Sequence, residues 1–141
     1  MSNTESKYRF LFAGGGTGGH LFPAVAVAEH IREMKPDADI LFVGTKDRIE
    51  EKVVPILGFK FKSIWIKGFS RKINFENLLF PVKLFVSMFQ SLIINISFKP
   101  KVAIGSGGYV AGPAIWAASF MGAKIILIEQ NSYPGVTTRL L

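Results

Sequence analysis

Short apolar runs alternate along this chain with segments long enough for a helix, and this alternation restricts the fold more than any other feature. Each apolar run leads through turn residues into a helical pattern, which is the order that parallel strands with crossover helices require. We therefore predict an α/β domain built on a parallel sheet with helices on both faces. The predicted strands are Tyr8–Ala13, Asp39–Val43, Phe59–Ile66, Lys101–Ile104 and Lys124–Ile128.

The segments between these strands carry helix signals at their ends. Asp47 is predicted to be an N-cap, with Glu50 at the third helical position as its capping-box partner. Glycine and asparagine breaks predict a loop over Lys67–Asn77. The predicted helices are a first one with Pro23 in its first turn that ends near Met34, then Asp47–Leu57, Leu78–Phe98, Ala114–Phe120, and the opening turns of another over Pro134–Leu141.

The segment Leu78–Phe98 is the most apolar part of the chain, and it is long enough to raise the question of a membrane span. Its polar residues recur at steps of three and four, so a helix would gather them on one face. We therefore interpret it as a mostly buried crossover helix with Pro81 in its first turn. The polar residues are Lys83, Ser87, Gln90, Ser91 and Asn95.

The net charge of +7 comes entirely from the stretch between Phe59 and Lys101, which holds eight basic residues and one acid, Glu76. Aromatic residues lie in the same stretch, among them Trp65, Phe69, Phe75, Phe80, Phe85 and Phe89. Cations beside exposed apolar groups favour an anionic membrane surface over nucleic acid. The plainer alternative is that the phenylalanines are ordinary core and the lysines a solvated rim. The absence of cysteine excludes disulfides and thiolate chemistry and fits a reducing compartment.

Two glycine-rich segments of the chain have similar sequences: GTGGHLFPAVAVA begins at Gly16 and GSGGYVAGPAIWAA begins at Gly105. Each follows a predicted strand, opens a predicted helix, and carries a small hydroxyl residue and an aromatic ring. Glycines let a ligand approach the backbone, and the free N–H groups of a helix start attract an anion. One such turn is often only tight packing, but two related turns predict a cleft for a phosphorylated ligand.

Other phosphate sites fit less well. A dinucleotide site needs an acid at the end of the second strand, where the chain has Val43-Gly44-Thr45, and a P-loop needs a Gly-Lys-Ser/Thr sequence that is missing. The two histidines, His20 and His30, share no ligand cluster with carboxylates, so neither a metal site nor a cofactor is predicted.

The segments AGGGTGGHLFPAVAVA, VGTKDRIEEKVVP, GSGGYVAGP and IEQN resemble, in this order, the MurG-type peptidoglycan glycosyltransferases, from about Phe10 to Leu141. The resemblance implies a Rossmann-like N-terminal half of a GT-B glycosyltransferase, in which residues 1–141 bind the acceptor and the C-terminal UDP-sugar domain is missing. It implies an inverting hexosyltransferase that moves N-acetylglucosamine from UDP-N-acetylglucosamine to undecaprenyl-diphosphate-muramyl-pentapeptide. The expected place is peripheral, on the cytoplasmic face of the plasma membrane.

The resemblance also implies residue roles. Residues of the first loop would approach the donor nucleotide, residues of the second would lie near the acceptor diphosphate, and the IEQN segment would contact sugar through Asn131. The substrate-binding residues carried over are Thr17, Gly18, Gly19, Gly107, Gly108, Tyr109, Gln130 and Asn131.

Two residues are candidates for the chemistry. His20 is the first choice for the base that takes the proton from the acceptor hydroxyl, because it stands at the mouth of a glycine loop and histidine is the side chain that most often serves as a general base. Its plainer role would be a hydrogen bond to neighbouring backbone. Glu129, at the carboxyl end of a strand, could act as a catalytic group, orient a partner or bind acceptor hydroxyls. Two rival functions stay open: another GT-B glycolipid glycosyltransferase, and a non-catalytic module that binds nucleotides or nucleic acid.

Overall fold

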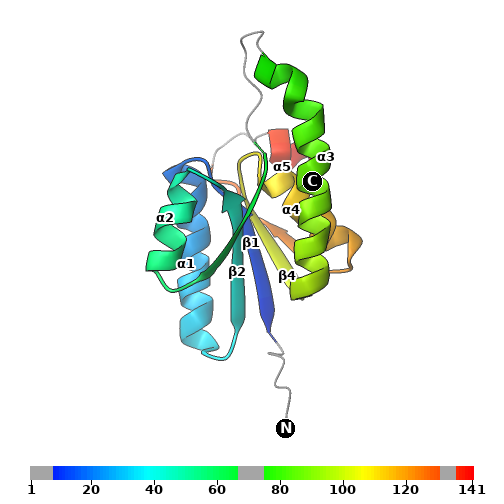
Figure 1. Cartoon of the computed structure of the whole chain (residues 1–141). Helices are drawn as coiled ribbons and strands as arrows, with labels where there is room; N and C mark the ends of the chain where they lie inside the picture. Colours follow the sequence, from blue (N-terminus) through cyan, green and yellow to red (C-terminus); the bar gives the residue numbers. More distant parts are fainter. Residues whose placement is uncertain (1–7, 67–74, 131–135) are drawn as a thin grey trace.

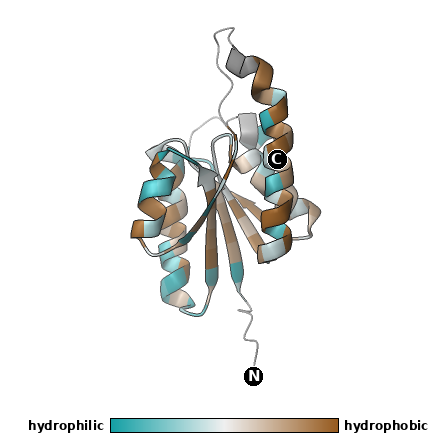
Figure 2. Ribbon diagram, viewed as in Figure 1, coloured by the Kyte–Doolittle hydropathy of each residue, from teal (hydrophilic) through white to brown (hydrophobic). Residues whose placement is uncertain are grey.

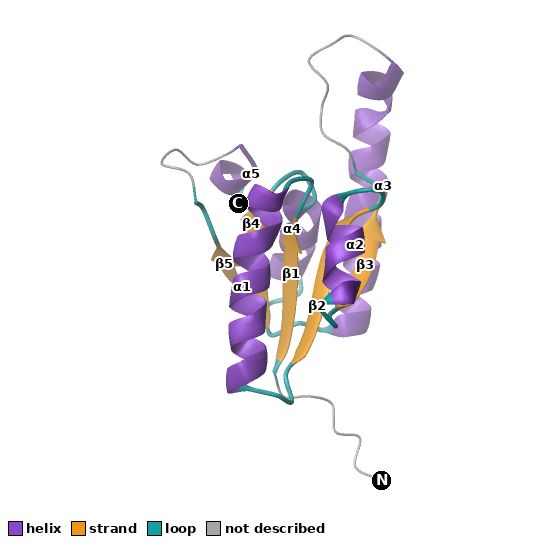
Figure 3. Ribbon diagram, turned by 90° about the vertical axis from the view of Figure 1, so that its left-hand side faces the viewer, coloured by secondary structure: helices purple, strands orange, loops and turns teal. Residues whose placement is uncertain are grey.

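The computed structural model describes residues 8–66, 75–130 and 136–141, and it has one parallel sheet between two layers of helices (Figures 1 and 3). The predicted α/β class is confirmed. The elements are β1 Arg9–Gly14, α1 Gly18–Met34, β2 Asp39–Thr45, α2 Ile49–Ile56, β3 Lys60–Ile64, α3 Phe75–Phe98, β4 Val102–Gly107, α4 Ala111–Phe120, β5 Lys124–Leu127 and α5 Val136–Leu140.

The strand order is β3-β2-β1-β4-β5, and every neighbouring pair is parallel. The chain winds outward from β1 to one edge of the sheet and then returns to build the other half from β4. Ligands of open α/β sheets bind where the order reverses, beyond the carboxyl ends of the strands. That point lies between β1 and β4, where Ala13 pairs with Gly105, so the two glycine loops leave the sheet side by side.

The core has two parts because side chains of a strand alternate between the faces of the sheet. Leu11 and Ala13 of β1 belong to the cluster beneath α3 and α4, whereas Phe12 belongs to the cluster beneath α1 and α2. In the second cluster, the rings of Phe12 and Phe42 stack with their centroids 5.0 Å apart. Helices thus cover both faces of the sheet, which explains why the strand sequences are continuous runs of apolar residues.

Helix α3 differs from its prediction. It is long and apolar enough over Leu78–Phe98 to cross a membrane by length and composition, yet only 22% of its most apolar window is buried. Many of its apolar side chains are exposed, among them Phe85, which is 75% exposed. In Figure 2 the ribbon of α3 is largely brown, the colour of hydrophobic residues. The expectation of a mostly buried helix is therefore wrong, because a helical pattern defines two faces without saying which one is turned inward.

The buried polar residues of α3 lie on its inward face. Ser87, Ser91 and Asn95 are buried, and the Asn95 side-chain amide donates to the carbonyl oxygens of Ser91 and Ala114 at 2.8 and 3.4 Å. The expected gathering of polar residues on one face is confirmed, and this face packs against α4. Ile94 is buried on the same side, and Leu84 and Phe98 pack against the core, so polar and apolar groups together hold α3 to the domain. Other large apolar side chains of α3, such as Phe85 and Phe89, are left exposed.

Smaller differences concern helix starts. Helix α1 begins at Gly18, so Pro23 lies inside it and not in its first turn. Asp47 does not cap α2: the N-cap is Arg48, and Asp47 has a φ of 64°. Of the expected loop at 67–77, residues 75–77 belong to α3, and the others lie outside the described residues.

Candidate functional site

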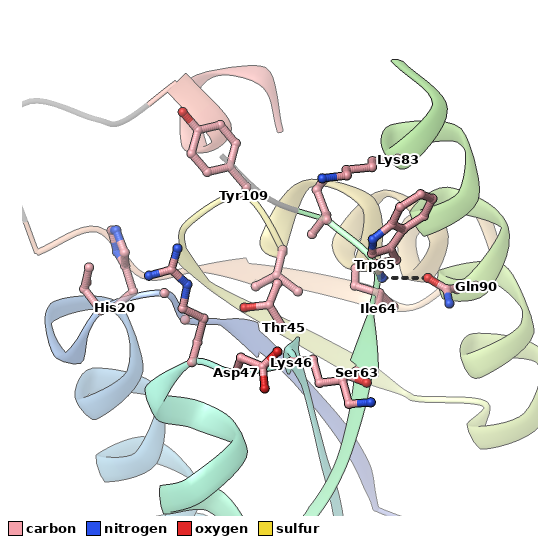
Figure 4. A pocket seen from close by; sticks show the side chains of 16 residues that line it. His20, Thr45, Lys46, Asp47, Ser63, Ile64, Trp65, Lys83, Gln90 and Tyr109 are labelled. Atoms are coloured by element: carbon pink, nitrogen blue, oxygen red, sulfur yellow. Dashed lines mark hydrogen bonds between the residues drawn. The ribbon is translucent and has the colours of Figure 1, made fainter. Parts of the chain in front are cut away.

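A cavity of about 840 Å³ opens at the carboxyl ends of the strands, between the two glycine loops and α3. We call it the loop cavity. Figure 4 shows His20 on the α1 side, Tyr109 on the second loop, and Trp65, Lys83 and Gln90 on the α3 side. The residues that line it are Gly15, Gly16, Thr17, His20, Thr45, Lys46, Asp47, Arg48, Ser63, Ile64, Trp65, Ile66, Lys83, Gln90, Tyr109 and Val110.

The two glycine loops touch backbone to backbone. The Gly15 N–H donates to the Gly107 carbonyl oxygen at 3.4 Å. A Cβ atom on Gly108 would lie 2.5 Å from the Gly15 carbonyl oxygen, and one on Gly107 would lie 2.6 Å from His20 Nδ1. Both Gly107 and Gly108 also have positive φ, so glycine is required there for conformation as well as for space. The predicted juxtaposition of the two loops is confirmed.

Glu50 holds the first loop in place, a role that the sequence analysis missed. Its side chain is buried, 1% exposed, and its carboxylate accepts the Gly16 N–H at 3.0 Å. The other oxygen accepts the Thr45 N–H at 2.9 Å and the Thr45 hydroxyl at 2.7 Å. Gly15 and Gly44 pack so closely on this side chain that a Cβ on either would lie 2.4 Å from it. The capping-box role is wrong because Glu50 turns into the site and links the ends of β1 and β2.

His20 is positioned by contacts from two other segments, the end of β4 and the residues that follow β5. Its ring packs against Gly107, and Gln130 Nε2 lies 3.4 Å from His20 Nδ1. The same Gln130 amide donates to the Gly19 carbonyl oxygen. That carbonyl would ordinarily accept a helical hydrogen bond from residue 23, but Pro23 has no N–H. Because of Pro23, the Gly19 carbonyl oxygen has no helical donor, and the Gln130 side chain after β5 donates to it instead.

The predicted site residues fall into three groups. Thr17, His20 and Tyr109 line the loop cavity. Gly18, Gly19, Gly107 and Gly108 belong to the two loops without lining it, and Gln130 contacts the first loop. Glu129 follows β5 and does not line the cavity. Asn131 lies outside the described residues.

The loop cavity suits an anion. Lys46, Arg48 and Lys83 line it against one acid, Asp47, and none of the three cations forms an ion pair within residues 8–66, 75–130 and 136–141. The start of α1 adds N–H groups that have no partner inside the helix. In the described part of the chain, no group of three His, Cys, Asp or Glu side chains is placed to hold a metal ion.

Two solved structures share the fold. The structure of MurG from Acinetobacter baumannii superposes with a TM-score of 0.78 at 26% identity, over 94% of this chain and 38% of the other. The glycosyltransferase SnogD from Streptomyces nogalater has a TM-score of 0.60 at 17% identity, over 94% of this chain and 36% of the other, and this likeness concerns the fold alone.

Sequence relatives are closer. Two of them carry the name UDP-N-acetylglucosamine--N-acetylmuramyl-(pentapeptide) pyrophosphoryl-undecaprenol N-acetylglucosamine transferase. The protein from Clostridioides difficile (strain 630) is 49% identical over 94% of this chain and 32% of its own length. The protein from Flavobacterium psychrophilum is 45% identical over 96% of this chain and 37% of its own length. The chain spans about a third of the length of these curated relatives. Residues 10–141 match the model of the glycosyltransferase family 28 N-terminal domain. With the paired loops, the doubly wound sheet and this match in agreement, the chain belongs to glycosyltransferase family 28 and carries its N-terminal domain.

Proposed function

We propose that this chain is the acceptor-binding half of an inverting N-acetylglucosaminyltransferase. The donor would be UDP-N-acetylglucosamine and the acceptor undecaprenyl-diphosphate-muramyl-pentapeptide, as the names of the relatives indicate for those proteins. The observation that carries the proposal is the loop cavity, where two helix-opening glycine loops meet at the reversal point of the sheet. A diphosphate-bearing ligand suits this mixture of backbone amides and unpaired cations.

In the reaction, the acceptor hydroxyl oxygen bonds to the anomeric carbon of N-acetylglucosamine while the bond to UDP breaks. Thr17, Gly18 and Gly19 at the start of α1 face the donor, with Asn131 and Gln130 on its sugar. Gly107, Gly108 and Tyr109 lie near the acceptor diphosphate. Helix-start amides then stabilise the negative charge that builds on the departing UDP.

His20 takes the proton from the acceptor hydroxyl in this proposal, with Glu129 as the second candidate for the chemistry. The Gln130 amide beside His20 Nδ1 supports a second candidate role, because a neutral ring that accepts a hydrogen bond there carries its proton on Nε2 and can donate it to a ligand. His20→Gln keeps a side-chain donor but cannot act as a base. If His20 is the base, His20→Gln and His20→Ala lose turnover alike; if it is a donor, His20→Gln retains much more turnover than His20→Ala.

Transfer itself is the test of the whole proposal. A polypeptide that joins this chain to a donor-binding domain is expected to transfer radiolabelled N-acetylglucosamine to the muramyl lipid and not to diacylglycerol. Transfer to diacylglycerol at an equal or higher rate would assign the chain to another class of glycolipid glycosyltransferase. Tight binding of RNA or DNA with no transfer to either acceptor would favour the nucleic-acid module.

We also propose that the chain is a peripheral protein on the cytoplasmic face of the plasma membrane, docked through the outer face of α3. Phe85, Phe89 and Ile93 are exposed there, and Lys99 follows the helix at its end. Phe85→Ser is expected to reduce cosedimentation with anionic vesicles. Ile56→Ser, at an 82% exposed site on α2, is the matched control and should leave it unchanged. Equal loss in both variants, or binding that ignores salt and lipid charge, would contradict this docking mode.

A further inference from the structure

Among the described cations between Phe59 and Lys101, Lys83 is the one that lines the loop cavity, and it lies on the inward face of α3. Gln90, two helical turns further on, accepts a hydrogen bond from the Trp65 N–H at 2.7 Å and so fixes this face of α3 over the loop cavity. Phe85 lies about 200° around the helix from Lys83, on the outer face. The Lys83 side chain therefore points away from the surface proposed to meet the lipid.

The amino group of Lys83 is held above an aromatic ring. Its Nζ atom lies 5.5 Å from the centroid of the Trp65 ring, an arrangement that favours a cation. Figure 4 shows this amino group directed from α3 across the cavity on the side of Tyr109. Lys83 is only half-buried and forms no ion pair with any residue that the structure describes, so its charge remains available to a ligand.

We propose that Lys83, seated on Trp65, binds the phosphate on the lipid side of the acceptor diphosphate. This inference rests on the proposed function. The prenyl chain must leave the cavity toward the apolar outer face of α3, while the sugar must reach His20 and the first loop. The phosphate attached to the lipid is therefore the anion nearest α3, and Lys83 is the cation that α3 contributes to the cavity.

The roles of the neighbours follow from this placement. Trp65 supports the Lys83 side chain and limits the positions of its amino group, and Gln90 holds the Trp65 backbone against α3. The sugar-side phosphate is left to Gly108 and Tyr109 on the second loop. In this arrangement α3 would both dock on the membrane and, through Lys83, bind the phosphate attached to the lipid. Membrane docking and acceptor binding would thus depend on the same helix.

The test uses farnesyl diphosphate, a short prenyl diphosphate, free in solution without membrane. Its dissociation constant for the 141-residue chain is measured by titration calorimetry for the unchanged protein, Lys83→Gln, Lys83→Arg and Lys101→Gln. Lys101 is an exposed cation at the start of β4, away from the cavity, and serves as the matched control. Lys83→Gln is expected to weaken binding on the order of tenfold or more, as loss of a charge-assisted hydrogen bond does. Lys83→Arg should stay within about threefold, because a guanidinium keeps the charge, can also lie over an aromatic ring and binds phosphate. Lys101→Gln should stay within the same range, because it lies outside the site.

A second arm separates the diphosphate from phospholipid headgroups. Lys83→Gln and Lys101→Gln are compared for binding to anionic phosphatidylglycerol vesicles, and equal, small losses are expected. If Lys83→Gln binds farnesyl diphosphate as tightly as the unchanged chain, or loses vesicle binding alone, Lys83 is not a diphosphate ligand although the proposed function stands. If the unchanged chain does not bind the probe, the proposed acceptor site and this inference fall together.

Discussion

Glu50→Gln changes one atom of the side chain that joins the first loop to the end of β2, and its effect can be worked from the hydrogen bonds. All three groups around the carboxylate are donors: the Gly16 N–H, the Thr45 N–H and the Thr45 hydroxyl. A glutamine can offer its oxygen to Thr45, but its NH₂ group then faces the Gly16 N–H. One charge-assisted bond is lost and a donor is left buried without a partner, so the free energy of unfolding should fall by about 2–4 kcal/mol.

Urea denaturation followed by circular dichroism measures this loss, with an unchanged slope as the sign that the unfolded state is unaffected. Glu51→Gln is the matched control, because the Glu51 carboxylate only accepts the Asp47 N–H at 3.2 Å in an exposed position. It should change stability by less than about 0.5 kcal/mol. A Glu50→Gln variant as stable as Glu51→Gln would refute the assignment of Glu50 as the link between β1 and β2.

Two further predictions concern close packing. Gly107→Ala should destabilise the chain by more than Gly122→Ala in the same urea assay. Both glycines have positive φ, but a Cβ atom on Gly107 would meet His20, whereas one on Gly122 would have nothing within 4 Å. Equal losses of stability would mean that backbone strain alone matters. Ser91→Ala should leave the melting temperature unchanged or raise it, since the buried Ser91 hydroxyl has no partner among the described residues, whereas Asn95→Ala should lower it by removing the amide that bonds Ala114. A lowered melting temperature for Ser91→Ala would indicate a bond that the structure does not contain.

The glycine loops and their neighbours were predictable because their signals are local. A strand that ends in glycines and continues into a helix specifies its turn within a few residues, and two such turns in one parallel sheet must open at the same edge. The strands were accordingly placed to within a few residues, and the two glycine loops were placed at the correct edge of the sheet. Only the ends shifted: β4 runs on through Ser106 to Gly107, because pairing with β1 continues past the predicted end.

What the sequence could not supply depends on contacts between distant segments. Glu50 satisfies a local capping pattern, yet its carboxylate binds Gly16, a residue 34 positions away, and no local pattern distinguishes the two uses. Helix α3 shows the same limit, since the pattern separates its polar and apolar faces but the partner decides which is buried. Here the partner is α4, whose Ala114 carbonyl is satisfied by Asn95. The exposed apolar face follows from that choice.

Pro23 shows how one backbone feature can join three parts of the site. By withholding an N–H it leaves the Gly19 carbonyl open, and Gln130 fills that position from the end of β5. Gln130 thereby also reaches His20, whose ring rests on Gly107 at the end of β4. The first loop is thus tied to β4 and β5 on one side and, through Glu50, to β2 on the other. The position of the first loop therefore depends on contacts from both halves of the sheet, which no local stretch of sequence contains.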